Sequence, residues 1–374
     1  MSARDFRSDT ITRPTAAMRE AMMSAPLGDD VFGDDPSVNR LQDEAARALG
    51  FEAAIFAPTG TQSNLIGIMS HCGRGDEMIV GQYAHTYRWE AGGMAVLGSI
   101  QPQPIEHAPD GTLPIDAIVA AIKPDDPHFA RTRLIALENT IGGKALPPDY
   151  LPRVVEIARA RGLAVHLDGA RLFNAAVAGL VPIDSLGDEQ GDRGTPPRDD
   201  VLAEARRLCA GVDSVSICLS KGLGAPAGSL LLGSREVIAR ARRIRKMVGG
   251  AMRQSGVLAA AGSHALAHHL SRLVDDHRHA ALLARGLGSI ISERPNLGEL
   301  MKVEPAQTNM VFVEIRQEVS ASFAEHLRNA DVRVTQSGNG PWVRQRWVTH
   351  LDVDRNDVLA ALDRVADWTP QREA

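Results

Sequence analysis

The chain has 374 residues, of which 44% are hydrophobic and 23% are charged, and its formal net charge is -5. This composition is typical of a globular protein with a large core, and the length favours two domains over one. Because the 41 basic residues are spread along the chain, the sequence shows neither a basic stripe for nucleic acid nor a polybasic membrane patch.

The N-terminal residues are charged and lack the apolar stretch of a signal peptide, and no apolar run approaches the length of a membrane span. The three cysteines, Cys72, Cys209 and Cys218, are widely separated and have neither a disulfide nor a zinc-site spacing. We therefore expect a cytoplasmic protein with no metal site, no membrane partner and no nucleic-acid partner.

Short apolar runs alternate with amphipathic segments along the first two thirds of the chain, which predicts a mainly parallel sheet with helices on both faces. The predicted strands are 53–57, 77–80, 95–100, 134–137, 163–167, 214–219 and 229–232. One intervening helix is clearly marked, since Asp35 can cap it, Pro36 suits its first position and Gly50 can end it.

From Arg235 to about Glu293 the pattern is helical, and strands are predicted at 309–315, 332–335 and 342–349. We therefore expect a large α/β domain over 15–250 and a smaller C-terminal α+β domain over 251–374, with segment 1–14 near the site. Residues 184–200 are polar and rich in glycine and proline, which predicts a surface insertion.

Two residues follow predicted strands and suit an aldehyde cofactor. Lys221 offers an amine for a Schiff base, and Asp168 offers a carboxylate that can hold a pyridine nitrogen protonated. Taken separately, each residue has a common structural explanation. Asp168 is an equally good candidate for a helix cap, and an isolated lysine usually lies on the surface. Together they predict pyridoxal 5'-phosphate at the carboxyl ends of the strands.

A phosphate site is predicted where the strand 53–57 meets the next helix. The free amides of Gly60, Thr61 and Gln62 can bind an anion there, although the same residues also make an ordinary turn. His85 follows another strand and could stack on a ring or move protons, as could His128 from a polar loop.

Arginine is the natural partner of a substrate carboxylate. Arg344 and Arg346 share one face of a predicted strand between apolar residues, and Arg171 follows Asp168 by three residues. The basic run from Arg242 to Arg253 reads as a solvated helix face with a glycine-rich end that leaves room for a phosphate or subunit contact.

Several motifs together resemble the low-specificity L-threonine aldolases, pyridoxal-phosphate enzymes of the aspartate-aminotransferase fold type. The resemblance covers nearly the whole chain and is carried by the segments Arg7–Thr12, Gly28–Pro36, Pro58–Thr61, Ala84-His85 with Glu90–Gly93, Glu138–Thr140, His166–Phe173, Leu219–Pro226 and Gly249–Gln254.

The resemblance implies roles for individual residues. It makes Lys221 the Schiff-base lysine, Asp168 the partner of the pyridine nitrogen and His85 the residue stacked on the ring. It places Gly60 and Thr61 at the phosphate and Arg171 beside the cofactor, where Arg171 joins Ser8 and Arg346 in holding the substrate carboxylate. It also implies that Lys246 and Arg253 reach a neighbouring subunit's cofactor, in a homo-oligomer that the family suggests is a tetramer.

The implied reaction is retro-aldol cleavage of L-threonine, L-allo-threonine and related β-hydroxy-α-amino acids to glycine and an aldehyde. His85 or His128 is expected to take the hydroxyl proton. Phe32 stands where the family usually has tyrosine, and Ile141-Gly142 replaces a common His-Asn. Three alternatives stay open: a β-eliminating or phenylserine-preferring enzyme with a pocket shaped by Trp89 and Phe32, a non-catalytic cofactor-binding protein, and a domain that needs no pyridoxal.

Overall fold

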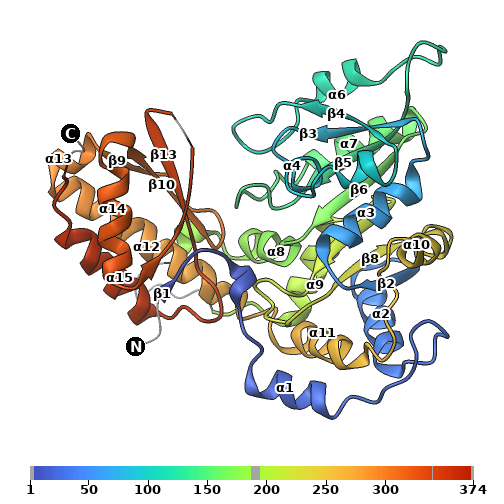
Figure 1. The fold of residues 1–374 in the computed structure, drawn as a ribbon, viewed down its shortest axis with the longest axis horizontal. Coiled ribbons are helices and arrows are strands. Elements are labelled where there is room, and N and C mark those ends of the chain that lie inside the picture. The colour runs from blue at the N-terminus through green and yellow to red at the C-terminus, as the bar shows by residue number, and fades with distance from the viewer. Residues whose placement is uncertain (1–3, 187–193, 339, 372–374) are drawn as a thin grey trace.

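The computed structural model describes residues 4–186, 194–338 and 340–371, and it contains a large and a small sheet, each with its own helices (Figure 1). The large sheet has the strand order β2-β8-β7-β6-β5-β3-β4. Its strands are β2 (Ala53–Ala57), β3 (Asp76–Gly81), β4 (Gln101–Ile105), β5 (Arg131–Glu138), β6 (Ala164–Gly169), β7 (Ser214–Cys218) and β8 (Ser229–Gly233).

All strands of this sheet are parallel except β8, which runs antiparallel to both of its neighbours. The reason lies in the connections. Most of the parallel pairs are joined through helices, whereas a ten-residue loop without a helix joins β7 directly to β8, and so short a loop suits an antiparallel pair. The predicted mainly parallel α/β sheet is thereby confirmed.

One predicted strand is wrong. The apolar residues of 95–100 begin in a short helix, α5 (Gly93–Val96), in which Val96 is 75% exposed, and the strand follows as Gln101–Ile105. That strand contains Pro102 and Pro104, which have no amide hydrogen to donate, and β4 lies at the edge of the sheet. Because its sequence is polar and contains two prolines, it lacks the apolar run by which buried strands are predicted.

Helices cover both faces of the large sheet. On adjacent strand positions, Ile55 packs with one apolar cluster and Phe56 with another, and Leu231 and Leu232 divide in the same way. The helices are α1 (Ala16–Met23), α2 (Pro36–Leu49), α3 (Gly60–His71), α4 (His85–Arg88), α5, α6 (Ile115–Ala121), α7 (Tyr150–Ala160), α8 (Leu172–Leu180), α9 (Arg198–Leu208), α10 (Arg235–Met247) and α11 (Gly256–His268).

The predicted punctuation of α2 is confirmed. The Asp35 side chain accepts hydrogen bonds from the amides of Ser37 and Val38, Pro36 is the first residue, and Gly50 ends the helix with a φ of 77°. The helix is therefore held at both ends by residues of its own sequence.

The small sheet is antiparallel, with the order β12-β13-β10-β9, and β1 (Arg4–Asp5) pairs beside it with β11 (Val332–Arg333). Its strands are β9 (Met301–Val303), β10 (Met310–Arg316), β12 (Thr335–Ser337) and β13 (Trp342–Val348), and its helices are α12 (Leu273–Glu293), α13 (Pro295–Gly298), α14 (Gln317–Asn329) and α15 (Arg355–Asp367). Helix α12 contributes Val274 to the large core and Leu283 to the small one, so it joins the two units. The domain division at residue 250 stays a prediction.

The N-terminal segment crosses from one unit to the other. Phe6 packs in the small core, while the Thr12 hydroxyl donates to the backbone oxygen of Lys221 at 2.9 Å.

Of the predicted insertion 184–200, residues 187–193 lie outside the described part, and Arg198–Asp200 form the first turn of α9. No described helix combines the length and the apolar character needed to cross a membrane.

Candidate active site

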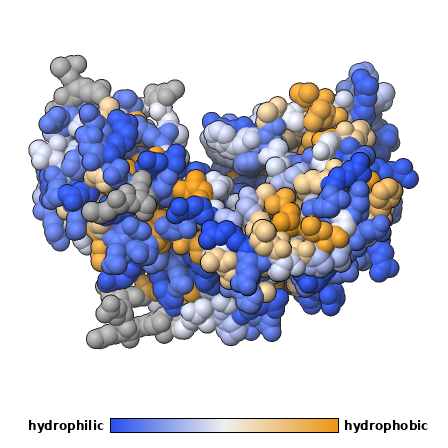
Figure 2. Space-filling view, turned by 60° about the horizontal axis from the view of Figure 1, so that its bottom comes forward, coloured by the Kyte–Doolittle hydropathy of each residue, from blue (hydrophilic) through white to orange (hydrophobic). Residues whose placement is uncertain are grey.

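A cavity of about 300 Å³ lies at the carboxyl ends of the large sheet's parallel strands and brings together five of the predicted residues, Lys221, Asp168, His85, Gly60 and Thr61. Figure 2 shows a groove between the two units of the molecule. The cavity is lined by Thr10, Pro58, Thr59, Gly60, Thr61, Asn64, His85, Asp168, Ala170, Ser216, Cys218, Ser220, Lys221, Pro226 and Ala227.

Lys221 lies in the loop between β7 and β8, as its position after a strand predicts. The loop is folded tightly, because the amide of Gly224, with a φ of 78°, donates to the Lys221 carbonyl at 2.8 Å. The Lys221 side chain is half-buried and lines the cavity. The loop therefore presents an amine to the cavity without burying it fully.

Asp168 ends β6 and is 3% exposed. One of its carboxylate oxygens accepts from the Asn64 amide nitrogen at 2.8 Å, and the other accepts from the backbone amide of Ala170 at 3.0 Å. The helix-cap interpretation is wrong, because the N-cap residue of α8 is Arg171 and Asp168 binds only the turn before that helix. The carboxylate is both buried and oriented.

His85 begins α4 beside two carboxylates. Its Nδ1 lies 2.9 Å from Glu90 Oε1, and its backbone amide donates to Glu138 Oε2 at 2.7 Å. The hydrogen bond with Glu90 raises the pKa of His85 against the opposing effect of burial. Burial, together with the charge of Asp168, raises the pKa of Glu138. Glu138 and Glu90 were expected only as parts of motifs, and their contacts became visible in the fold.

The phosphate prediction needs one correction. The amide of Gln62 donates to the Thr59 hydroxyl at 3.1 Å, and its side chain turns away to the Val248 carbonyl at 3.3 Å. The first two amides of α3, those of Gly60 and Thr61, have no partner within the helix. Beside Gly60 lies the buried hydroxyl of Ser229, which has no hydrogen-bond partner in the described residues. An anion at this helix start would contact Gly60, Thr61 and Ser229 rather than Gln62.

The arginines near the N-terminal segment differ in their partners. Arg171 forms a two-fold ion pair with the buried Asp9, with distances of 2.8 and 2.6 Å. Arg346 donates to the Arg7 carbonyl at 3.0 Å, and its buried Nε has no partner in the described residues. Burial and the charge of Arg171 lower the pKa of Arg346, so the two guanidinium groups lie within electrostatic reach of each other. Two neighbouring cations of this kind suit a carboxylate.

The remaining residues of this predicted clamp are placed differently. Ser8 caps a short 3-10 helix, η1 (Asp9–Ile11), and accepts from the Thr10 amide at 3.3 Å. Arg344 forms an ion pair with Glu304 at 2.7 Å and lies over the Phe312 ring, although its Nε, like that of Arg346, has no partner among the described residues. None of Ser8, Arg171, Arg344 and Arg346 lines the cavity itself, so the choice of Arg346 for the carboxylate stays a prediction.

Asp9, which the motif contained but to which no role was assigned, is expected to couple pH to stability. Burial alone would raise its pKa, but Arg171, together with Lys221 and Asn309, outweighs burial and lowers the pKa from 3.8 to about 2. Because the folded-state pKa is depressed, the stabilisation, roughly 2 kcal/mol, is present above pH 4 and is lost as the pH falls towards 2.

Asp9→Asn is therefore expected to lower the free energy of urea unfolding at pH 6 while losing less of it than the parent between pH 5 and pH 3. A variant whose acid sensitivity equals that of the parent would contradict this linkage.

His128 is not at the cavity within this subunit. It lies just before β5, and its side chain is 86% exposed and hydrogen-bonded to Asp126. The carboxyl end of β5, Glu138, is the end that reaches His85, and an eight-residue strand spans roughly 25 Å. His128 therefore lies at the amino end of β5, whereas the cavity lies at the carboxyl ends of the parallel strands.

Lys246 and Arg253 are exposed, and Arg253 pairs with Asp29 at 3.2 Å. Neither residue lines the cavity of its own subunit. The same holds for Phe32 and Trp89, which are 77% and 65% exposed, so the proposed apolar pocket does not form within one subunit.

In the same basic run as Lys246 and Arg253, Arg245 is not solvated as predicted: it is buried and donates to Asp30 at 2.7 Å and to the Phe56 carbonyl.

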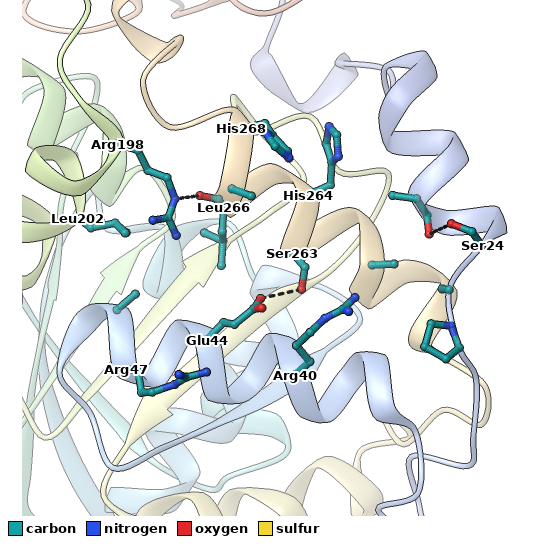
Figure 3. A pocket seen from close by; sticks show the side chains of 16 residues that line it. Ser24, Arg40, Glu44, Arg47, Arg198, Leu202, Ser263, His264, Leu266 and His268 are labelled. Atoms are coloured by element: carbon teal, nitrogen blue, oxygen red, sulfur yellow. Dashed lines mark hydrogen bonds between the residues drawn. The ribbon is translucent and has the colours of Figure 1, made fainter.

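A larger cavity of about 770 Å³ lies elsewhere, between α1, α2, α9 and α11 (Figure 3). Arg40, Arg47 and Arg198 approach it, and inside it Ser263 donates to Glu44 at 3.0 Å. It contains no lysine and none of the residues of the sequence motifs. The smaller cavity therefore remains the candidate active site.

Comparisons with known proteins agree with this choice. The family model described as beta-eliminating lyase matches residues 5–318. The low specificity L-threonine aldolase of Escherichia coli (strain K12) is 53% identical over 354 residues, covering 95% of this chain and 96% of that protein.

Two solved structures show the same fold. A Leishmania major threonine aldolase has a TM-score of 0.73 at 20% identity, covering 97% of this chain and 99% of the other. A structure of SPT with PLP has a TM-score of 0.70 at 16% identity, covering 98% and 86%. At these identities the structures support the fold alone.

Proposed function

Because the chain belongs to the beta-eliminating lyase family and, within it, to the low-specificity L-threonine aldolases, we propose that it cleaves L-threonine, L-allo-threonine and related β-hydroxy-α-amino acids to glycine and an aldehyde. The observation that carries the proposal is the convergence of Lys221, Asp168 and His85 on one cavity beside a helix start. Acetaldehyde is the expected co-product of threonine.

The residues present fit pyridoxal 5'-phosphate. The Ser229 hydroxyl, which has no partner among the described residues, and the first two amides of α3, those of Gly60 and Thr61, would hold its phosphate. Asp168 would face the ring nitrogen, His85 the ring and Lys221 the aldehyde carbon. When bound, the cofactor supplies an electron-accepting ring that stabilises the negative charge developing on the substrate's α-carbon.

The chain's own groups decide which bond of the substrate is broken. We propose that Arg346, Arg171 and Ser8 hold the substrate carboxylate and thereby orient the bond between the α- and β-carbons for cleavage. Arg171 keeps its ion pair with Asp9 and contributes its charge, whereas the unpartnered Nε of Arg346 can donate directly.

His85 is the proposed base for the substrate's β-hydroxyl proton, and Glu90 holds its ring through Nδ1, which leaves Nε2 to accept. Within one subunit, the position of His128 at the other end of β5 removes it from this role.

The carboxylate of Glu90 is expected to set the pH at which His85 becomes a base. Since Glu90 raises the pKa of His85, Glu90→Gln should lower it and move the acid limb of the kcat/KM profile to lower pH. His85→Asn should remove that limb and reduce turnover by about 10²-fold or more. An unchanged acid limb in Glu90→Gln would exclude His85 as the titrating base.

The function itself is tested with the holoprotein and L-threonine, L-allo-threonine, L-phenylserine and the D-forms, with identification of both products. Glycine and the matching aldehyde are expected from the L-substrates. If no L-substrate yields glycine, the aldolase proposal is wrong. Ammonia and a keto acid would instead support β-elimination, the reaction for which the matched family model is named.

We further propose that the active form is a homo-oligomer with sites shared across a dimer interface, and a homotetramer by family resemblance. Support comes from large apolar side chains left exposed on the larger unit, Phe32, Trp89, Val96, Leu97 and Met247, and from the apolar patches in Figure 2. Exposed Lys246, Arg253 and His128 are candidates for reaching a neighbour's site. Light scattering of the holoprotein measures the subunit number.

We also propose a cytoplasmic location. All three cysteines are unpaired and buried, and burial raises the pKa of Cys72 and of Cys209 to about 12. Such thiols suit a reducing compartment.

A further inference from the structure

A buried layer of polar side chains lies between α3 and the middle strands of the large sheet, where apolar packing would be usual. From α3 it contains Asn64, and from the sheet His166 and Ser214, each 3% exposed or less. Buried polar groups lower stability unless they are fully hydrogen-bonded, so a connected layer of this kind indicates a function.

The hydrogen bonds in this layer form one chain. The Asn64 amide nitrogen lies 2.8 Å from Asp168 Oδ2 and 2.9 Å from Glu90 Oε1, and its oxygen lies 3.2 Å from His166 Nε2. His166 Nδ1 and His71 Nε2 each lie 2.8 Å from the Ser214 hydroxyl.

The two carboxylates determine the direction of every bond. Because Asn64 donates to both of them, its oxygen must accept, and His166 must donate from Nε2. The other ring nitrogen of His166 then accepts from Ser214, whose oxygen is left to accept from His71. Burial, aided by the neighbouring His71, lowers the pKa of His166 to about 3, which keeps the ring neutral as this pattern requires. All donors therefore point towards Asp168 and Glu90.

The fold makes room for this chain. A side-chain carbon on Gly67 of α3 would lie 2.8 Å from Cε1 of His166, closer than packed atoms approach. Gly67 thus leaves the space that the imidazole ring occupies beneath the helix.

The charges around Asp168 show why such a donor is needed. Glu138 on β5 and Glu90 after α4 are acids beside Asp168, and burial together with the charge of Asp168 raises the pKa of both. His85, Lys221 and Arg171 are cationic groups near these acids, and His166 is neutral. Asn64 gives one uncharged donor to two carboxylates at once.

We propose that Asn64 is a positioning residue, oriented by His166 and Ser214, which holds the Asp168 carboxylate against the ring nitrogen and at the same time fixes Glu90 and, through it, His85. This inference rests on the proposed function, because the ring nitrogen belongs to the expected cofactor. It adds a single amide that couples the two groups facing that ring.

The test follows the visible absorbance of the bound cofactor in the holoprotein as a function of pH. Asn64→Leu is expected to raise the pH at the midpoint of this absorbance change by about one pH unit. This corresponds to a tenfold change in the protonation equilibrium of the bound cofactor. His166→Leu should shift the midpoint in the same direction because the Asn64 amide is then free to turn. His166→Gln, which retains a donor, should restore it to within about 0.3 unit.

Ser63→Ala is the matched control. Ser63 lies on the same helix and is similarly buried, but among the described residues its hydroxyl bonds with Ser216, which is not part of this hydrogen-bond chain. A shift in Ser63→Ala as large as in Asn64→Leu would show a packing effect and overturn the proposal. So would an unshifted midpoint in Asn64→Leu or equal midpoints in the two His166 variants.

If Asn64→Leu does not fold, Ser214→Ala provides the same measurement with a smaller upward shift expected, and an unshifted midpoint there overturns the proposal. A parent protein without visible cofactor absorbance would instead contradict the proposed function, so the two failures are distinguishable.

Discussion

Lys221→Ala is expected to abolish covalent attachment of the cofactor by borohydride reduction and to reduce aldol cleavage by about 10³-fold or more. Lys221 is the lysine among the residues that line the cavity, where the β7–β8 loop presents its half-buried side chain. No other lining residue offers an amine for the covalent bond to the cofactor. The measurement is reduction with borohydride followed by peptide mapping, together with glycine formation from L-threonine.

Lys302→Ala is the control for this experiment, because Lys302 lies over the Trp342 ring in the small unit, away from the cavity. It should retain both label and activity. Label found on a peptide that lacks Lys221 in the parent protein, or activity in Lys221→Ala near that of the parent, would show that the covalent anchor is elsewhere.

Arg346→Leu is expected to reduce kcat/KM by about 10- to 150-fold, since hydrogen bonds to a charged group contribute about 1.5–3 kcal/mol. The loss arises because the buried Nε of Arg346 is the available guanidinium donor beside Arg171, which is already paired with Asp9. Arg346→Lys should recover part of the loss by keeping the charge without the planar fork.

Arg344→Leu is the matched control on the same strand and face, where the guanidinium is already paired with Glu304. Its kcat/KM should stay within a few-fold of the parent value. If the two leucine variants lose equal activity, the carboxylate is not held by Arg346 and the effect belongs to β13 as a whole.

Local sequence predicted the positions that depend on a strand and the turn after it. Lys221 after β7, Asp168 at the end of β6 and Gly60 at the start of α3 all lie at one cavity, because the carboxyl ends of parallel strands meet at one edge of the sheet. His128 was predicted from a polar loop instead, and because that loop precedes β5, it lies away from the cavity of its own subunit.

Partners contributed by distant segments could not be predicted. Asp9 and Arg171 are 162 residues apart, Asn64 and Asp168 are 104 apart, and nothing in either local pattern indicates a contact. The burial of Arg245 is a similar case. The local sequence of its helix is basic and predicts a solvated face, and only the fold brings Asp30 into contact with Arg245.

The sequence by itself determined the alternation of strands and helices, the motifs and therefore the expected chemistry of Lys221, Asp168 and His85. Only the tertiary structure decided which polar groups meet: it paired Arg171 with Asp9 and Arg344 with Glu304, left Arg346 Nε and the Ser229 hydroxyl without a partner among the described residues, and joined Asn64 to two carboxylates. The physical reason is that strand and helix periodicity is written in neighbouring residues, whereas hydrogen-bond and charge partners depend on which distant segments the packed sheet brings together.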